Sequence, residues 1–273
     1  MTLDLKEGMI DLPDGAKMYF FAFGTGEKPM VVIPGLSVRN YKGMAYPFAF
    51  LYRMFAKDFR VCVFDRRTPV YKGITAEDIA EDIHFGMEHL GIEDAAVLGV
   101  SQGGMIAQYL ALNHPEKVGR MVLAVTLCRN NPTIVSAIDI WKEFARNKDF
   151  PGLCDDLFNR MYTAEYLRKN RLLLPVVTRL TKHMGAGRFL VLADACTTCD
   201  TYDRLPELKQ PVLVIGGWHD NIVTPEASQE IYDQLLKRDP AIETELYIYE
   251  DGGHSVYEEA EDFDERVHEF LVK

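Results

Sequence analysis

The stretch Ala95-Ala-Val-Leu-Gly-Val-Ser-Gln-Gly-Gly-Met-Ile-Ala107 decides the fold of this chain. Its first six residues are apolar and predict a buried strand, and an amphipathic helical pattern begins after Ser101. Gly99, Ser101 and Gly103 form the pattern Gly-x-Ser-x-Gly, which between a strand and a helix is typical of a nucleophile elbow. The two glycines have no Cβ atom to clash in so tight a turn, and Gly104 lets the helix pack closely on the strand. The sequence therefore predicts a reactive serine at this turn.

A reactive serine needs a base to take its proton and an acid to orient that base, and two downstream residues are candidates for these roles. Residues 211–217 form an apolar, β-branched run that ends shortly before Asp220. A second strand pattern at 244–249 is followed by His254. Both candidates therefore lie beyond a strand end, where open parallel sheets have their active sites. With Ser101 they follow the order Ser, Asp, His that belongs to this kind of elbow.

These motifs resemble those of the α/β-hydrolase superfamily, and the resemblance covers nearly the whole chain. Its further landmarks are Val31-Val-Ile-Pro-Gly35, Val61-Cys-Val-Phe-Asp65, Asn113-His-Pro-Glu-Lys-Val118 and Gly216-Gly-Trp-His-Asp220. The resemblance implies an α/β fold with a mostly parallel eight-stranded sheet, helices on both faces and a helical cap. Many relatives have His-Gly where this chain has Pro34-Gly35.

The resemblance also implies a role for each candidate residue. Ser101 would be the nucleophile, His254 the general base and Asp220 the orienting acid. The backbone N–H groups of Leu36 and Gln102 would form the oxyanion hole, and because these donors belong to the main chain, the Pro34 difference leaves the hole intact. The resemblance implies no cofactor and no metal ion.

Strand and helix patterns alternate along most of the chain, which predicts a parallel sheet with both faces covered. A helix is expected at residues 50–57, and another from a capping box at Thr75 to Gly91. Thr224 is the expected N-cap of a helix that runs to about residue 236, with Pro225 at its first position. A single helix is expected at 256–271.

The alternation is interrupted between residues 129 and 202, where only helical patterns occur. They cover residues 134–144, 153–162, 167–180 and 187–195. We therefore predict a core domain of residues 1–128 and 203–273 with an inserted helical cap of residues 129–202. A cap of this kind excludes water and shapes the pocket.

Aromatic residues and methionines of the cap and of the loop at 37–47 are candidates for an apolar substrate pocket. The candidates are Tyr41, Tyr46, Trp141, Phe144, Phe158, Met161, Tyr162 and Met184. Most cap side chains of this kind belong to the packing of the cap itself, so we expect only some of them to line the pocket. The predicted partner is a small molecule with an apolar portion.

Composition and charge narrow the choice of partner and location. The chain has 273 residues, 48% of them hydrophobic, and a net charge of -11. This charge disfavours nucleic acid and anionic membranes as partners, and the absence of a basic and apolar leader leads us to expect a cytoplasmic protein. Five cysteines disfavour a disulfide framework. Cys196 and Cys199 have redox or zinc spacing, but without a second pair we expect no such role.

Several alternatives stay open at this point. Arg66 and Arg67 follow a strand and either bind a substrate carboxylate or, as we favour, pair with a loop acid. His219 is expected to face outward. A serine at the elbow disfavours dehalogenases and epoxide hydrolases. Carbon–carbon bond hydrolases typically have asparagine where this chain has Val100, so we consider them less favoured than esterases and lactonases. An acyltransferase and a ligand receptor of low turnover remain alternatives.

Overall fold

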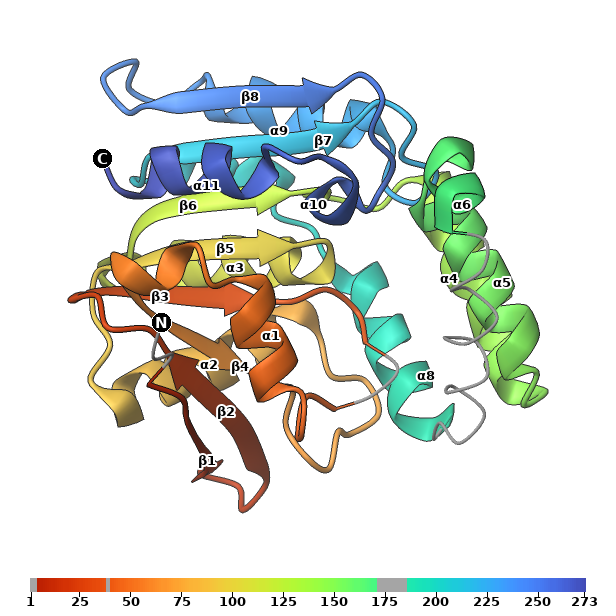
Figure 1. Cartoon of the computed structure of the whole chain (residues 1–273), viewed down its shortest axis with the longest axis horizontal. Helices are drawn as coiled ribbons and strands as arrows, with labels where there is room; N and C mark the ends of the chain where they lie inside the picture. Colours follow the sequence, from red (N-terminus) through yellow and green to blue (C-terminus); the bar gives the residue numbers. More distant parts are fainter. Residues whose placement is uncertain (1–3, 38–39, 171–185) are drawn as a thin grey trace.

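The computed structural model describes residues 4–37, 40–170 and 186–273, and within them one eight-stranded sheet forms the centre of the molecule (Figure 1). The strand order is β1-β2-β4-β3-β5-β6-β7-β8; β1 and β2 pair antiparallel, as do β2 and β4, and all other neighbours are parallel. The strands are β1 (Lys6–Asp11), β2 (Lys17–Phe23), β3 (Lys28–Ile33), β4 (Phe59–Phe64), β5 (Ala95–Val100), β6 (Val118–Ala124), β7 (Val212–Gly217) and β8 (Thr244–Tyr249). The predicted mostly parallel sheet is therefore confirmed.

Helices cover both faces of the sheet. The helices are α1 (Ala45–Leu51), α2 (Ala76–Leu90), α3 (Gln102–Asn113), α4 (Pro132–Arg146), α5 (Phe150–Met161), α6 (Ala164–Asn170), α8 (Ala186–Ala195), α9 (Pro225–Leu235), α10 (Val256–Glu259) and α11 (Phe263–Leu271). Figure 1 shows α1 and α11 in front of the sheet and α2, α3 and α9 behind it. Because successive side chains of a strand point to opposite faces, Val31 and Val32 belong to two separate apolar clusters, one under each layer of helices.

Helices α4, α5, α6 and α8 come between β6 and β7 in the chain. They lie beyond the carboxyl ends of the parallel strands (Figure 1). They occupy the part of the chain where helical patterns were expected. Residues 171–180 of the expected helix 167–180 lie outside the described residues. The division into a core domain and a cap at residues 129–202 stays a prediction.

The expected start and end of α2 are confirmed. The Asp78 N–H donates to Thr75 Oγ1 (3.0 Å), and the Thr75 N–H donates to Asp78 Oδ2 (2.8 Å), which completes the capping box. Gly91 ends the helix with a φ of 65°, a backbone conformation that favours glycine.

Two helix boundaries differ from the prediction. The helix expected at 50–57 is instead α1, which begins at Ala45, followed by a short 3₁₀ turn at Phe55–Lys57. Pro47 lies in the first turn of α1, where its missing N–H costs no helical hydrogen bond, so the proline does not mark a loop. The helix expected at 256–271 is broken into α10 and α11, because Ala260 between them has an extended backbone.

The prediction of Thr224 as the N-cap of α9 is confirmed. Thr224 precedes α9 with Pro225 at the first helical position, as expected, but its side chain makes no capping hydrogen bond. Its φ is 72°, in the left-handed region that a β-branched residue rarely adopts. Ile222 and Val223 form the turn before Thr224, and their N–H groups donate to Asp220 Oδ1.

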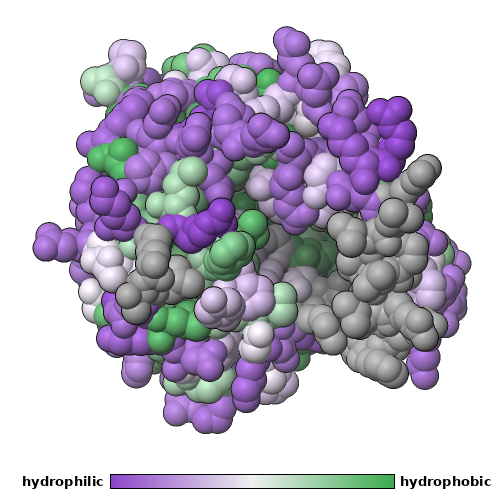
Figure 2. All heavy atoms as spheres, in the orientation of Figure 1, coloured by the Kyte–Doolittle hydropathy of each residue, from purple (hydrophilic) through white to green (hydrophobic). Residues whose placement is uncertain are grey.

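The surface is mostly polar on the face seen in Figure 2, and hydrophobic residues are visible inside a hollow near its middle. Within the described part of the chain, no helix is long and apolar enough to cross a membrane.

Candidate active site

Ser101 lies between β5 and α3 in a strained backbone conformation. Its φ is 54° and its ψ is -120°, outside the regions that a serine ordinarily occupies. Neighbouring glycines make the turn possible: a Cβ atom on Gly103 would lie 1.8 Å from the Ile33 carbonyl oxygen, and one on Gly99 would lie 2.7 Å from the Gly103 oxygen. The turn therefore lifts the Ser101 hydroxyl out of the sheet at the carboxyl end of its central strand.

His254 and Asp220 meet Ser101 at this edge. The distance from Ser101 Oγ to His254 Nε2 is 3.0 Å, and that from His254 Nδ1 to Asp220 Oδ2 is 2.8 Å. Asp220 follows β7 and His254 follows β8, so the three residues come from the ends of strands that are close together in the sheet. The side chains of Asp220 and His254 are buried. The structure thus brings together all three residues that the sequence singled out.

The loop that carries His254 is tied to the helices of residues 150–170. The Ser255 N–H donates to the Met161 carbonyl at 2.9 Å. The Glu259 carboxylate accepts the Gly253 N–H (2.6 Å) on one oxygen and the Thr163 N–H (2.7 Å) on the other. These bonds fix the histidine loop against α5 and α6, so the position of the imidazole depends on the place of these helices.

Two backbone N–H groups near Ser101 are free to act as donors. Gln102 is the first residue of α3, where an N–H has no partner inside the helix. The N–H groups of Leu36 and Gln102 have no acceptor among the residues that the structure describes. Gly35, beside Leu36, lies so close to Ser101 that a Cβ on it would be 3.3 Å from the Ser101 Cβ. Both expected donors therefore belong to segments that adjoin Ser101.

A buried arginine joins these two donor segments, and sequence reasoning did not find this role. Arg66 Nη2 donates to the Pro34 carbonyl (2.6 Å) and to Gln102 Oε1 (3.2 Å). The Gln102 amide in turn donates from Nε2 to the Leu192 carbonyl of α8 (2.7 Å) and contacts Cys196 Sγ (3.1 Å). The guanidinium thus links the loop after β3 to the start of α3, and the Gln102 amide extends this link to α8.

The environment of Arg66 is unusual for a cation. The side chain is buried, and its Nη1 has no hydrogen-bond partner among the described residues. Burial lowers the pKa of Arg66. Its partners are neutral oxygens, so the favoured pairing with a loop acid is wrong for Arg66.

That pairing holds for Arg67. Its guanidinium makes two bonds to the Asp82 carboxylate of α2, 2.6 and 2.7 Å long, and also pairs with Asp14. The carboxylate beside Arg66, Asp65, instead pairs with Arg188 of α8 at 2.8 Å. Arg67 is therefore a structural residue.

A cavity of about 60 Å³ opens on Ser101 and His254. It is lined by Gly35, Leu36, Ser101, Met105, Ile134, Ile138, Trp141, Leu157, Met161, Phe189, Cys196, Ile222, His254 and Tyr257. The lining is mostly apolar, and much of it comes from α4, α5 and α8. The spacing of Ile134, Ile138 and Trp141 on α4 is a helical stripe, a signal by which the sequence could have identified this wall.

Of the aromatic candidates, Trp141 lines this cavity, as does Met161. Tyr41, Phe144, Phe158 and Tyr162 do not line it, and their packing shows why. Tyr41 packs its ring edge-on against Phe48, and Phe144 packs beside Gly152 of α5. Phe158 lies next to Tyr162, which stacks on Tyr166 and donates to Glu258 (2.5 Å). Tyr46 is exposed, and Met184 lies outside the described residues.

Cys196, Cys199 and His219 lie outside the chain of hydrogen bonds from Ser101 to Asp220. Cys196 and Cys199 are unpaired and buried, and burial raises the pKa of each thiol to about 12. Burial therefore disfavours the thiolate form of both cysteines. His219 is exposed, as expected.

Sequence comparison identifies relatives that share most of this chain. It is 22% identical over 231 residues to 3-oxoadipate enol-lactonase 2 of Acinetobacter baylyi, covering 80% of this chain and 81% of the relative. It is 24% identical to 2-hydroxy-6-oxononadienedioate/2-hydroxy-6-oxononatrienedioate hydrolase 2 of Pseudomonas putida, covering 98% and 94% of the two chains.

Structure comparison and a family model agree with this result. The enol-lactonase of Burkholderia xenovorans LB400 superposes with a TM-score of 0.81 at 23% identity, over 97% of this chain and all of that one. An esterase of Exiguobacterium antarcticum superposes with a TM-score of 0.79 at 20% identity, over 97% and 99% of the two chains. The family model for the alpha/beta hydrolase fold matches residues 28–261. The chain therefore belongs to the alpha/beta hydrolase family.

Proposed function

We propose that this protein is a serine hydrolase that cleaves a small carboxylic ester or lactone through an acyl-enzyme on Ser101. The observation that carries the proposal is the continuous chain of hydrogen bonds from Ser101 Oγ to His254 Nε2 and from His254 Nδ1 to Asp220 Oδ2. In this arrangement the imidazole can take the serine proton while the carboxylate holds its tautomer.

In the first half of the reaction, His254 takes the proton as Ser101 Oγ attacks the carbonyl carbon of the substrate. The negative charge that develops on the carbonyl oxygen is stabilised by the N–H groups of Leu36 and Gln102. When the tetrahedral intermediate collapses, the bond to the leaving oxygen breaks, and His254 donates its proton to that oxygen. An alcohol leaves; from a lactone, the hydroxyl stays attached to the acyl group.

In the second half, His254 takes a proton from water, and the resulting hydroxide attacks the acyl carbon. The bond to Ser101 Oγ breaks, and His254 returns the proton to the serine. Asp220 stabilises the charged imidazole in both halves, and it is buried and fixed by the N–H groups of Ile222 and Val223.

The choice of esters and lactones rests on the cavity and on the relatives. The apolar lining suits the hydrocarbon part of a small acyl group. The Acinetobacter baylyi relative and the Burkholderia xenovorans neighbour are enol-lactonases by name, and the Exiguobacterium antarcticum neighbour is an esterase. We assign the cap of residues 129–202 the role of excluding water and selecting the substrate, because α4, α5 and α8 supply much of the lining.

A carbon–carbon bond hydrolase on the same triad is the second candidate. The Pseudomonas putida relative, a 2-hydroxy-6-oxononadienedioate/2-hydroxy-6-oxononatrienedioate hydrolase by name, matches almost the whole chain. Such enzymes typically have asparagine where this chain has Val100, and this difference favours hydrolysis of an ester or lactone. An acyltransferase would use the same triad with an alcohol in place of water, and a ligand receptor of this fold would bind without turnover.

Steady-state hydrolysis of p-nitrophenyl esters and of small lactones tests the proposal, with Ser101→Ala and Ser136→Ala as a matched pair. Ser136 is an exposed serine of α4, so its replacement should leave the rate unchanged. We expect Ser101→Ala to lose hydrolysis while it keeps the wild-type Tm. Comparable turnover by Ser101→Ala would refute the mechanism. Product analysis with added alcohol separates transfer from hydrolysis, and an alkyl ester as the main product would indicate an acyltransferase.

A further inference from the structure

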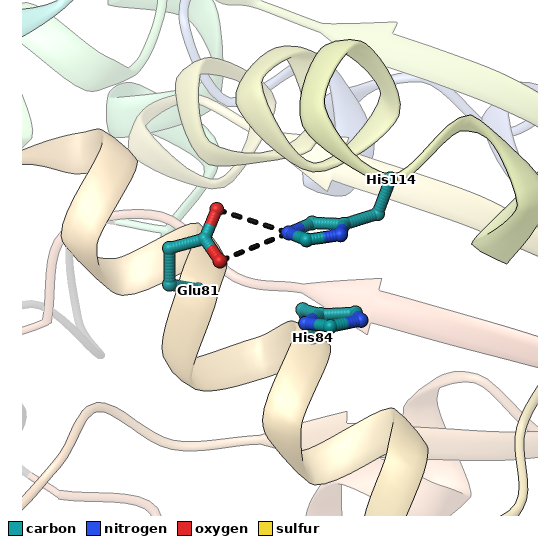
Figure 3. A group of neighbouring side chains, drawn as sticks. All are labelled: Glu81, His84 and His114. Atoms are coloured by element: carbon teal, nitrogen blue, oxygen red, sulfur yellow. Dashed lines mark hydrogen bonds and ion pairs between the residues drawn. The ribbon is translucent and has the colours of Figure 1, made fainter.

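A second cluster of chemically reactive side chains lies at the opposite end of α3 from Ser101. It consists of Glu81 and His84 on α2 and of His114, which follows the last residue of α3 (Figure 3). Helix α3 has twelve residues, so this cluster is about 18 Å from the catalytic serine along the helix axis. It takes no part in the hydrolytic mechanism.

The three side chains present their ligand atoms to one another. One ligand atom of each residue lies within 4.8 Å of the other two. His114 Nε2 is 2.9 and 3.0 Å from the two oxygens of the Glu81 carboxylate. Two ligands that each lie about 2.1 Å from one tetrahedral ion are about 3.4 Å apart. Glu81 and His114 therefore need to separate by only about 0.5 Å to hold an ion between them.

His84 is the third ligand and can turn toward the ion. Its ring is stacked on that of His114 with centroids 3.5 Å apart and planes 4° from parallel, as Figure 3 shows edge-on. A face-to-face sandwich is not a preferred arrangement of aromatic rings, and rotation of an imidazole about its Cβ–Cγ bond is soft. The His84 side chain is 25% exposed, so its ring has room to rotate.

The surroundings leave Glu81 as the carboxylate of the cluster. Glu88 Oε1 lies 3.8 Å from His84 Nε2, but the same oxygen is paired with the buried Lys117. Asn113 Nδ2 donates to Glu81 Oε1 at 3.2 Å and to Glu77 Oε1 at 2.9 Å, which holds the Glu81 carboxylate in place and keeps a second acidic group nearby. Hydrogen bonds to ligating carboxylates are a common feature of metal sites.

We propose that Glu81, His84 and His114 form a binding site for a divalent transition-metal ion of the zinc type, which links α2 to the end of α3. Two imidazoles and one carboxylate suit zinc and its neighbours rather than magnesium or calcium, which prefer oxygen ligands alone. Three protein ligands leave a further position for water. The ion would act as a clamp between two helices that both pack on the same face of the sheet.

Isothermal titration of tag-free, EDTA-dialysed protein with Zn²⁺ tests this proposal, and Co²⁺ absorption reports the coordination. We expect one equivalent of Zn²⁺ to bind, visible Co²⁺ bands, and a rise in Tm of about 5 °C at zinc concentrations near 100 times Kd. His84→Ala, His114→Ala and Glu81→Gln should each weaken binding at least tenfold.

His89→Ala is the matched control, because His89 is an exposed histidine on the same helix outside the cluster. It should bind Zn²⁺ like the wild type. The Tm of each variant without metal shows whether the fold is intact. Absence of saturable binding to the wild-type protein would overturn the proposal, and so would binding that survives His84→Ala or that is lost equally in His89→Ala.

Discussion

At the scale of single residues, Gln102 connects one of the proposed oxyanion donors to Arg66 and to α8. Its backbone N–H is one of the proposed donors, while its side chain is bonded to Arg66 on one side and to the Leu192 carbonyl on the other. Arg66 also holds the Pro34 carbonyl, two residues before the second donor, Leu36. This network fixes the separation of the two donors, so we regard Arg66 and Gln102 as positioning residues.

Gln102→Leu tests the positioning role. The apolar side chain keeps the volume but leaves Arg66 Nη2 with one acceptor fewer, so the donors shift and kcat should fall about 10- to 100-fold with little change in KM. Gln108→Leu is the control, since Gln108 is a buried glutamine of the same helix that bonds to Gly104 and Leu127 away from the donors. Both variants should lower the Tm. An equal loss of kcat in Gln108→Leu would contradict the positioning role.

Asp220→Asn tests the supporting role of the acid. The amide preserves the shape of the side chain but favours the wrong tautomer of His254, so kcat should fall by about 10⁴-fold. Ser101→Ala, which removes the nucleophile itself, should cost about 10⁶-fold. Steady-state rates of the two variants with one ester give the comparison, and equal residual rates would argue against separate roles.

At the scale of elements, local signals predicted some boundaries and missed others. The ends of α2 were predictable because the capping box and Gly91 act within one turn of the chain. The break between α10 and α11 was not predictable, because Glu259, at the end of α10, is bound by Thr163, which is distant in the sequence. Helical periodicity also indicated the helices between β6 and β7, but not which of their aromatic side chains face Ser101. That choice depends on how α4, α5 and α8 pack together.

Thr75→Ala measures the value of the capping box. The substitution removes the acceptor of the Asp78 N–H and should lower the free energy of unfolding by about 1 kcal/mol. Thr224→Ala is a matched control, since Thr224 also precedes a helix but makes no capping bond. Urea unfolding of both variants is the measurement. A loss in Thr224→Ala as large as in Thr75→Ala would show that the capping bond is not the cause.

At the scale of the whole molecule, the sheet topology assembles the site. The strands that precede Ser101, Asp220 and His254 are β5, β7 and β8, which lie parallel in one half of the sheet. The order of strand patterns was enough to predict this meeting, because parallel strands end at the same edge. The buried guanidinium of Arg66 could not be predicted in the same way, since its partners are contributed by three distant segments.

The buried carboxyl group of Asp264 in α11 should make the stability of the protein depend on pH. Burial raises the pKa of Asp264, in the first turn of this helix, to about 6. Between its ordinary pKa and pH 6 the folded state keeps a proton that the unfolded chain has released, so stability falls as the pH rises through this range. Asp264→Asn removes this loss, and its Tm relative to the wild type should increase from pH 4.5 to pH 7.5.

Glu265→Gln is the control for Asp264→Asn. It removes an acidic group from the same helical turn at an exposed position, and so reproduces any effect on the helix dipole. Its Tm relative to the wild type should not rise over this pH range. A parallel rise in both variants would assign the effect to the helix end rather than to the burial of Asp264.

The central claim is an activated nucleophile at residue 101, and the most direct measurement is intact mass after incubation with a fluorophosphonate probe. Wild type and Ser101→Ala are treated in parallel, with Ser136→Ala to show that an ordinary serine is not labelled. We predict one adduct on the wild type and on Ser136→Ala, and none on Ser101→Ala. An unlabelled, folded wild type, or an adduct that persists in Ser101→Ala, would contradict the account.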